Sequence, residues 1–109
     1  MRESQTAVLE RGVVLEGEIA TEPFEAAWAT EARWFVQFLE SDTGRVQAKT
    51  QISADGLTWV DHESEPAVGE MRGVITTSVR DFGHWLRLVI TPEEVTSAPL
   101  TRVYLVLKE

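Results

Sequence analysis

The chain has 109 residues, of which 43% are hydrophobic and 26% are charged. A chain of this length makes one domain, and its composition is that of a globular protein rather than a disordered one. Ten Lys and Arg against eighteen Asp and Glu give a formal net charge of −8. Nucleic acids and anionic lipid surfaces attract clustered positive charge, so this charge balance disfavours both as partners.

The sequence contains no cysteine, which excludes disulfides, thiolate metal sites and a cysteine nucleophile. Residues 1–6 lack the basic run and apolar core of a secretion signal. No window approaches the roughly 18 apolar residues that a membrane-spanning helix needs. We therefore expect the chain to be synthesised as a soluble cytoplasmic protein. Incorporation into a virion is compatible with this expectation.

The first 32 residues predict strands and a loop with one-sided charge. Residues 7–10 and 13–19 alternate as strands that meet near Gly12, and residues 21–28 predict a helical turn or a crossing loop. Between Gly12 and Ala32 there is no Lys or Arg, and the acidic residues are Glu16, Glu18, Glu22, Glu25 and Glu31. Two interpretations fit this acidic segment: a solvated edge or loop, and a docking surface for a basic partner or a cation. We expect a single domain over residues 1–109, with 1–32 as an N-terminal arm or edge segment.

Residues 32–40 and 45–53 predict two paired strands. The first is rich in aromatic and β-branched residues and apolar on both faces, as in a central strand. The second alternates strictly, which predicts one buried and one solvated face. The four residues between them end in Gly44 and predict a turn, so we expect an antiparallel hairpin.

A second hairpin follows directly. Asp55 and Gly56 predict a tight turn, and residues 58–62 predict a short returning strand. Three more short strands are predicted over residues 74–79, 85–90 and 101–107. Seven to eight short antiparallel strands with regular turns are typical of an all-β sandwich or a barrel.

Three stretches carry a family resemblance. Ser53-Ala54-Asp55-Gly56-Leu57-Thr58-Trp59 resembles the Ser-x-Asp-Gly-x-Thr-Trp hairpin of discoidin domains, also called coagulation factor 5/8 type C domains. His84-Trp85-Leu86-Arg87-Leu88 is similar to that family's penultimate strand, and Arg102-Val103-Tyr104-Leu105 to its closing strand. These domains are galactose-binding-like jelly-roll sandwiches. Over about residues 34–107, the resemblance implies a jelly-roll-like antiparallel β-sandwich.

The chain also departs from that family. Discoidin domains are usually longer, and their secreted members carry a disulfide, which this sequence lacks. The resemblance therefore transfers no ligand site. The hairpin residues Ser53, Asp55, Gly56 and Trp59 are expected to be structural instead. Asp55 accepts bonds from the turn backbone, Gly56 takes the strained conformation, and Trp59 packs over the turn.

Few residues suggest metal or catalytic chemistry. His62 lies in the acidic stretch 61–65, but neighbouring residues on a strand point to opposite faces, so we expect a solvated turn without a metal. His84 is expected at a turn or on the surface. No serine lies in a nucleophile elbow and no Gly-rich phosphate loop is present. The sequence predicts no catalytic residue, no cofactor and no enzymatic activity.

The four tryptophans are the better lead for a binding surface. We expect Trp34 and Trp59 in the core, because burying an indole removes a large apolar area from water. Trp28 lies in the acidic segment and is expected to be exposed or at an interface. The candidate ligand or partner residues are Trp28, Trp85, Arg87 and Gln37.

Two functional hypotheses remain. In the first, the chain is a non-enzymatic structural or docking subunit of a larger assembly, such as a phage virion decoration or tail protein, or an accessory subunit of a bacterial complex. Its partner is then another protein or a second copy, since an open sandwich leaves sheet edges free for association. The alternative is a carbohydrate-binding module of the galactose-binding-like type, with a glycan as its ligand.

Overall fold

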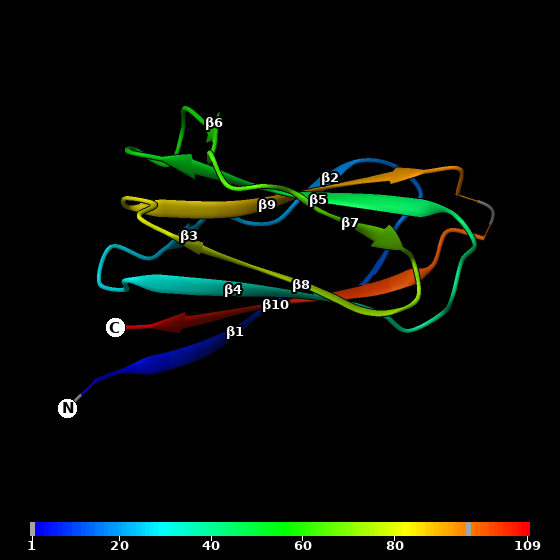
Figure 1. The fold of residues 1–109 in the computed structure, drawn as a ribbon, viewed down its shortest axis with the longest axis horizontal. Coiled ribbons are helices and arrows are strands. Elements are labelled where there is room, and N and C mark those ends of the chain that lie inside the picture. Colours follow the sequence, from blue (N-terminus) through cyan, green and yellow to red (C-terminus); the bar gives the residue numbers. More distant parts are fainter. Residues whose placement is uncertain (1, 96) are drawn as a thin grey trace.

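The chain folds into two antiparallel sheets packed face to face, in a computed structural model that describes residues 2–95 and 97–109 (Figure 1). The strands of the described residues are β1 (Ser4–Val14), β2 (Ile19–Ala20), β3 (Phe24–Glu25), β4 (Glu31–Phe38), β5 (Arg45–Ser53), β6 (Val60–Asp61), β7 (Ala67–Glu70), β8 (Gly73–Arg80), β9 (Trp85–Glu93) and β10 (Leu100–Lys108). The predicted all-β antiparallel sandwich is confirmed. The strands number more than the predicted seven to eight because β3 and β7, of two and four residues, lie where no strand was predicted and are too short to show a period.

Sheet A has the order β1-β10-β4-β8, and sheet B has the order β2-β9-β5-β6. Short strands β3 and β7 pair with β9 and β5 respectively. Alternation in the long strands places one set of side chains between the sheets, since successive residues point to opposite faces. The buried set includes Trp34 and Leu105 from sheet A and Ala48 and Leu88 from sheet B.

One buried hydrogen bond joins the two sheets. The Trp34 indole N–H in β4 donates to the Thr50 hydroxyl in β5 at 3.0 Å, and both side chains are at most 2% exposed. Thr50 is the one polar residue on the inward face of β5, and this bond supplies the partner that a buried polar group needs. Trp34 therefore lies in the core, as the sequence predicted.

The predicted hairpin between residues 32–40 and 45–53 is wrong. Strand β4 pairs with β10 and β8 in sheet A, whereas β5 pairs with β9, β6 and β7 in sheet B. The connection crosses from one sheet to the other, and it is held by both a local and a distant hydrogen bond. Asp42, which is buried, accepts hydrogen bonds from Gly44 N–H at 2.8 Å and from Ser97 N–H at 2.6 Å.

The N-terminal third lies along one side of the sandwich. Strand β1 is an edge of sheet A, and β2 and β3 lie on the open side of β9 in sheet B. The predicted break near Gly12 is absent, since β1 runs through it with two register shifts against β10. Such bulges bend an edge strand and disturb its ladder.

Candidate functional site

The hairpin after β5 is held by two side chains. The Ser53 hydroxyl accepts from Gly56 N–H at 2.8 Å and donates to the Asp55 carboxylate at 2.9 Å. The same carboxylate accepts from the N–H groups of Leu57 and Thr58 at 2.8 and 2.9 Å. These hydrogen bonds hold the pKa of Asp55 below its usual 3.8, because they stabilise the charged carboxylate. The bond from Thr58 has the largest effect, followed by those from Leu57 and Ser53.

Trp59 and Arg87 lie together on the outer face of sheet B. The Arg87 guanidinium stands 4.5 Å from the centre of the Trp59 ring, and its Nε donates to the Gln51 amide at 2.8 Å. The prediction that Trp59 lies in the core is wrong, since its side chain is half-buried. Its ring packs against the Arg87 guanidinium on the outer face and not against the other sheet. The half-buried Trp85 lies under the turn, where Gly56, at φ 80°, leaves room for its ring.

The predicted ligand residues do not form one site. Trp85 and Arg87 share the outer face of β9, but Gln37 is in β4 of the other sheet. Trp28, expected to be the most exposed indole, is half-buried and packs against the core. The loop after β3 folds it inward, since Ala29 N–H bonds the carbonyl of Ala26, a fully buried residue.

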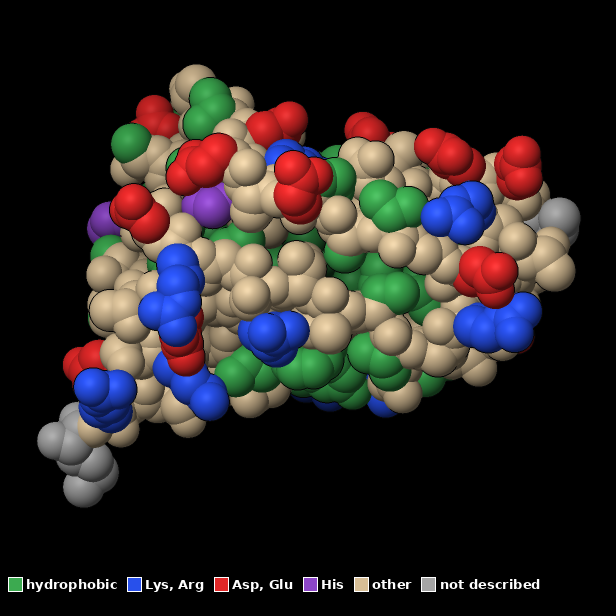
Figure 2. Space-filling view, viewed as in Figure 1, with side chains coloured by type: hydrophobic (Ala, Val, Ile, Leu, Met, Phe, Trp, Pro, Cys, Tyr) green, Lys and Arg blue, Asp and Glu red, His purple; other side chains and the backbone are tan. Residues whose placement is uncertain are grey.

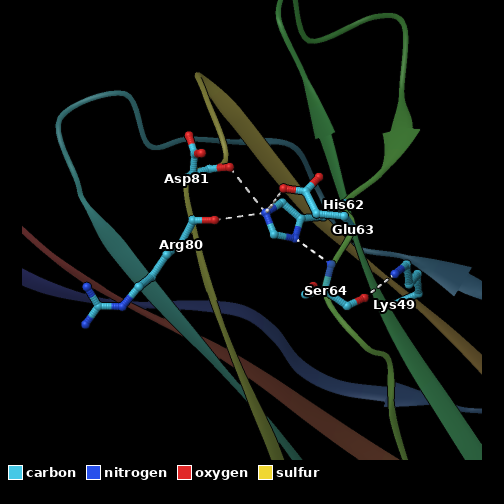
Figure 3. Close-up of polar contacts among 6 residues, drawn as sticks. All are labelled: Lys49, His62, Glu63, Ser64, Arg80 and Asp81. Carbon is cyan, nitrogen blue, oxygen red and sulfur yellow. Dashed lines mark hydrogen bonds and ion pairs between the residues drawn. The ribbon is translucent and has the colours of Figure 1, made fainter.

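His62 is buried and tied to the end of β8 (Figure 3). Its Nε2 lies 2.9 Å from the Arg80 carbonyl oxygen and 3.3 Å from that of Asp81, while Nδ1 accepts from Ser64 N–H at 3.0 Å. Two carbonyls at Nε2 and a donor at Nδ1 fix the tautomer with the proton on Nε2. The predicted solvated turn is wrong for this residue, since its ring fastens the β6–β7 segment to sheet A. The described residues contain no group of three or more His, Asp or Glu placed to hold a metal ion.

A larger surface lies on the outer face of sheet A, which we call face A. Cross-strand neighbours Val8, Tyr104 and Phe35 form an apolar row across β1, β10 and β4. Val106 adjoins this row on β10, and Val74, 52% exposed, lies at its far side on β8. Along the lower margin of Figure 2, hydrophobic side chains gather over sheet A with Lys and Arg side chains beside them.

Cations surround the apolar row. On β10, β4 and β8, face A carries Arg33, Arg80, Arg102 and Lys108 against one carboxylate, Glu31. Three of them line a shallow hollow of about 250 Å³ together with Phe35 and Val106: Arg33, Arg80 and Lys108.

Several of these side chains are held in place. Arg80 pairs with Glu31 at 2.5 Å, and Arg33 donates to the Thr76 hydroxyl at 3.2 Å. Arg102 donates from Nε to the Arg11 carbonyl at 3.0 Å. Face A thus brings together aromatic residues and Arg, the residue types that are enriched at protein–protein interfaces.

Sequence reasoning missed face A. Each strand contributes only one or two members, so no single stretch of sequence displays the set. The available signal was the outward half of the alternation in residues 101–107, where Arg102, Tyr104 and Val106 oppose the buried residues.

The comparisons with known proteins rest on structure alone, since no family model and no curated protein sequence matches the chain. The solved structure of the SPBc2 prophage-derived protein YomS is similar with a TM-score of 0.66 and 8% identity, over 100% of this chain and 96% of that one. A structure described as Bacillus endospore appendages that form a novel family of disulfide-linked pili is similar with a TM-score of 0.56 and 13% identity, over 98% of this chain and 85% of that one.

A family two carbohydrate esterase from Cellvibrio japonicus is similar with a TM-score of 0.52 and 10% identity, over 99% of this chain but only 34% of that one. At such low identities these likenesses show a shared sandwich fold. Within residues 2–95 and 97–109, the structure holds no helix of the length and apolarity that a membrane crossing requires.

Proposed function

We propose that this chain is a non-catalytic structural subunit of a protein assembly, and that face A docks on the acidic surface of a neighbouring copy. The observation that carries the proposal is the apolar row Val8–Tyr104–Phe35, framed by cations on a strongly acidic chain. Exposed apolar patches with a polar rim mark protein interaction sites.

Charge complementarity favours another copy as the partner. Strands β10, β4 and β8 bring four cations and one carboxylate to face A, so the rest of the chain carries six cations and seventeen carboxylates, a net charge of −11. Opposite potentials on two parts of one subunit favour a head-to-tail contact, the kind that builds rings or filaments.

The structural neighbours support an assembly component. One comes from a prophage and one from spore appendages that form pili. A phage decoration or tail protein is one such component. Because this chain has no cysteine, it would join any comparable assembly without disulfides.

Sedimentation velocity over a series of protein and salt concentrations tests the proposal. We expect reversible association that weakens as NaCl rises, because salt screens exposed charges. Charge reversal on face A by Arg33→Glu or Arg102→Glu should weaken association at least about tenfold, which corresponds to about 1.4 kcal/mol. Arg45→Glu, on the outer face of sheet B, is the matched control. A monomer under all conditions, or equal loss with Arg45→Glu, would refute the role of face A.

A carbohydrate-binding module of the discoidin or galactose-binding-like type is the second candidate. A polar groove on the outer face of sheet B favours it: Gln47, Lys49, Gln51, Asp61 and Arg87 line about 280 Å³. Sugar modules stack pyranose rings on aromatic side chains, but Arg87 already covers one side of the nearby Trp59 ring. Glycan-array binding by a monomer that loses its signal with Gln51→Ala would favour this candidate over the first.

A further inference from the structure

The hairpin that follows β5 ends in an exposed apolar tip, which we define as residues 54–60. Leu57 is 84% exposed and Val60 is 59% exposed, the two highest values among the large hydrophobic side chains of the described residues. Figure 1 shows this hairpin rising from sheet B on the side away from sheet A. In Figure 2, hydrophobic side chains stand out at the same corner, with Asp and Glu side chains around them.

The turn holds Leu57 in a fixed position. The Asp55 carboxylate accepts hydrogen bonds from the N–H groups of Leu57 and Thr58, at 2.8 and 2.9 Å. The Ser53 hydroxyl accepts one from Gly56 N–H at 2.8 Å. Because the backbone on both sides of Leu57 is already ordered, little conformational entropy is lost when its side chain enters a partner. A single exposed leucine is common on protein surfaces, but one that is presented rigidly is suited to anchor a contact.

Negative charge surrounds the tip. Residues 53–65 contain no Lys or Arg, and Asp81 lines a hollow beside Val60. Two cations, Lys49 and Arg87, reach this region from β5 and β9. Five carboxylates against these two cations give a net charge of −3; the five are Asp55, Asp61, Glu63, Glu65 and Asp81.

The hollow on face A has the opposite charge. Phe35 and Val106 give it an apolar lining, and Arg33, Arg80 and Lys108 give it positive charge. With the one carboxylate of its lining counted, the hollow has a net charge of +2. Its volume is about 250 Å³, whereas a cavity of about 150 Å³ already holds benzene, which has more carbon atoms than a leucine side chain. The hollow therefore offers room, apolar contact and opposite charge to the tip of another copy.

We infer that the tip of one copy inserts Leu57 into the hollow on face A of a neighbouring copy. This rests on the proposed function and names the segment that meets face A. The tip projects from sheet B and the hollow opens on the outer face of sheet A, so a chain cannot fill its own hollow (Figure 1). Each copy can instead give its tip to one neighbour and receive the tip of another. Such a head-to-tail contact repeats into a ring or a filament.

A two-fold contact between two copies of face A fits the charges less well. It would bring together the cations of both hollows, which are Arg33, Arg80 and Lys108 from each copy. Like charges that face each other across an interface oppose binding. The acidic tip instead places carboxylates near these cations, which favours the head-to-tail arrangement over the two-fold one.

Leu57→Ser removes the apolar anchor and leaves the charge of the tip unchanged. Because the Leu57 side chain is 84% exposed, the variant should stay folded, which far-UV circular dichroism and thermal unfolding check. We expect its association in sedimentation velocity to be at least about tenfold weaker than that of the parent. The matched control is Val68→Ser, an exposed residue of β7 that pairs with the opposite end of β5. This control should associate like the parent.

A mixture of two defective variants tests the direction of the contact. Leu57→Ser lacks the anchor but keeps the hollow, whereas Arg33→Glu keeps the anchor but has a defective hollow. A head-to-tail contact leaves one intact interface between them, so the mixture should form a one-to-one dimer at least about tenfold more tightly than either variant associates alone. This dimer should not grow, because its outer tip and outer hollow are the defective ones. In a two-fold contact of face A, mixing would restore nothing.

Cysteine pairs test whether the tip lies against the hollow. The parent has no cysteine, and Ser78 lines the hollow and is exposed. Leu57→Cys keeps a small apolar side chain at the anchor position. Mixed with Ser78→Cys, it should form a disulfide between copies at least about tenfold faster than Val68→Cys does in the same mixture, because a disulfide needs its two Cα atoms within a few ångströms.

The outcomes separate this inference from the proposed function. Weak association of Leu57→Ser that is restored by adding Arg33→Glu supports insertion of the tip. Parent-like association of Leu57→Ser, with weak association of Arg33→Glu, overturns the tip as the occupant and leaves the role of face A standing. Loss in both variants that mixing does not restore overturns the head-to-tail contact. A parent protein that stays monomeric overturns both proposals.

Discussion

The hydrogen bond between Trp34 and Thr50 should measurably stabilise the sandwich. It joins sheets A and B inside the core, at 3.0 Å and with both residues at most 2% exposed. Thr50→Val keeps the side-chain shape but leaves the indole N–H without an acceptor. We expect a loss of about 1–3 kcal/mol in the free energy of unfolding, the cost of a buried donor without a partner.

A double-mutant cycle isolates the bond from the packing. Trp34→Phe removes the donor and part of the ring and should cost more than Thr50→Val, because it also leaves a cavity. The double variant removes both polar groups, so its loss should fall short of the sum by about 1–2 kcal/mol. Urea unfolding followed by far-UV circular dichroism measures all four proteins on one scale.

Thr101 provides the control for this cycle. It is fully buried, and its hydroxyl donates locally to the Pro99 carbonyl at 3.0 Å rather than across the sheets. Trp34→Phe combined with Thr101→Val should therefore be additive within about 0.5 kcal/mol. A coupling between Trp34 and Thr50 no larger than this would refute the reasoning.

Two further predictions concern turns. At Gly44 an added Cβ would lie 2.5 Å from the Glu93 carbonyl oxygen, whereas at Gly17 nothing lies within 4 Å. Gly44→Ala should therefore cost about 1–3 kcal/mol of stability and Gly17→Ala far less, measured by urea unfolding; equal losses would contradict the close approach. The pKa of Asp55 is lowered in the folded state, so its contribution to stability is present above its usual value of 3.8 and is lost as pH falls through the folded value. Asp55→Asn should remove this part of the acid dependence, so the urea midpoints of the parent and the variant should converge as pH falls through the folded pKa of Asp55, and a constant gap would count against the assignment.

Local pattern predicted much of the fold. The alternation in residues 45–53 correctly predicted a strand with one buried and one solvated face, because burial on one face of a strand imposes a period of two. Trp34 was correctly placed in the core because burying an indole removes a large apolar area from water. The Ser53–Asp55 turn was visible because its bonds join residues that are neighbours in sequence.

Strand pairing could not be predicted in the same way. The turn before Gly44 is compatible with a hairpin, and what sends the chain to the other sheet is the bond from Ser97 to Asp42, 55 residues away. Trp59 and Trp28 were misplaced for a related reason, since Arg87 and the fold of the loop after β3 decide their burial. Contacts of this range leave no signature in a single window of sequence.

The same limit applies to face A, and salt dependence tests its role. Face A concentrates positive charge on a chain of net charge −8, so docking through it on an acidic surface should weaken as salt rises. Association driven by apolar contact alone would instead be preserved or strengthened, because salt also screens the repulsion between two copies of net negative charge. Association in sedimentation velocity that does not fall between low and high NaCl would therefore refute the electrostatic part of the reasoning.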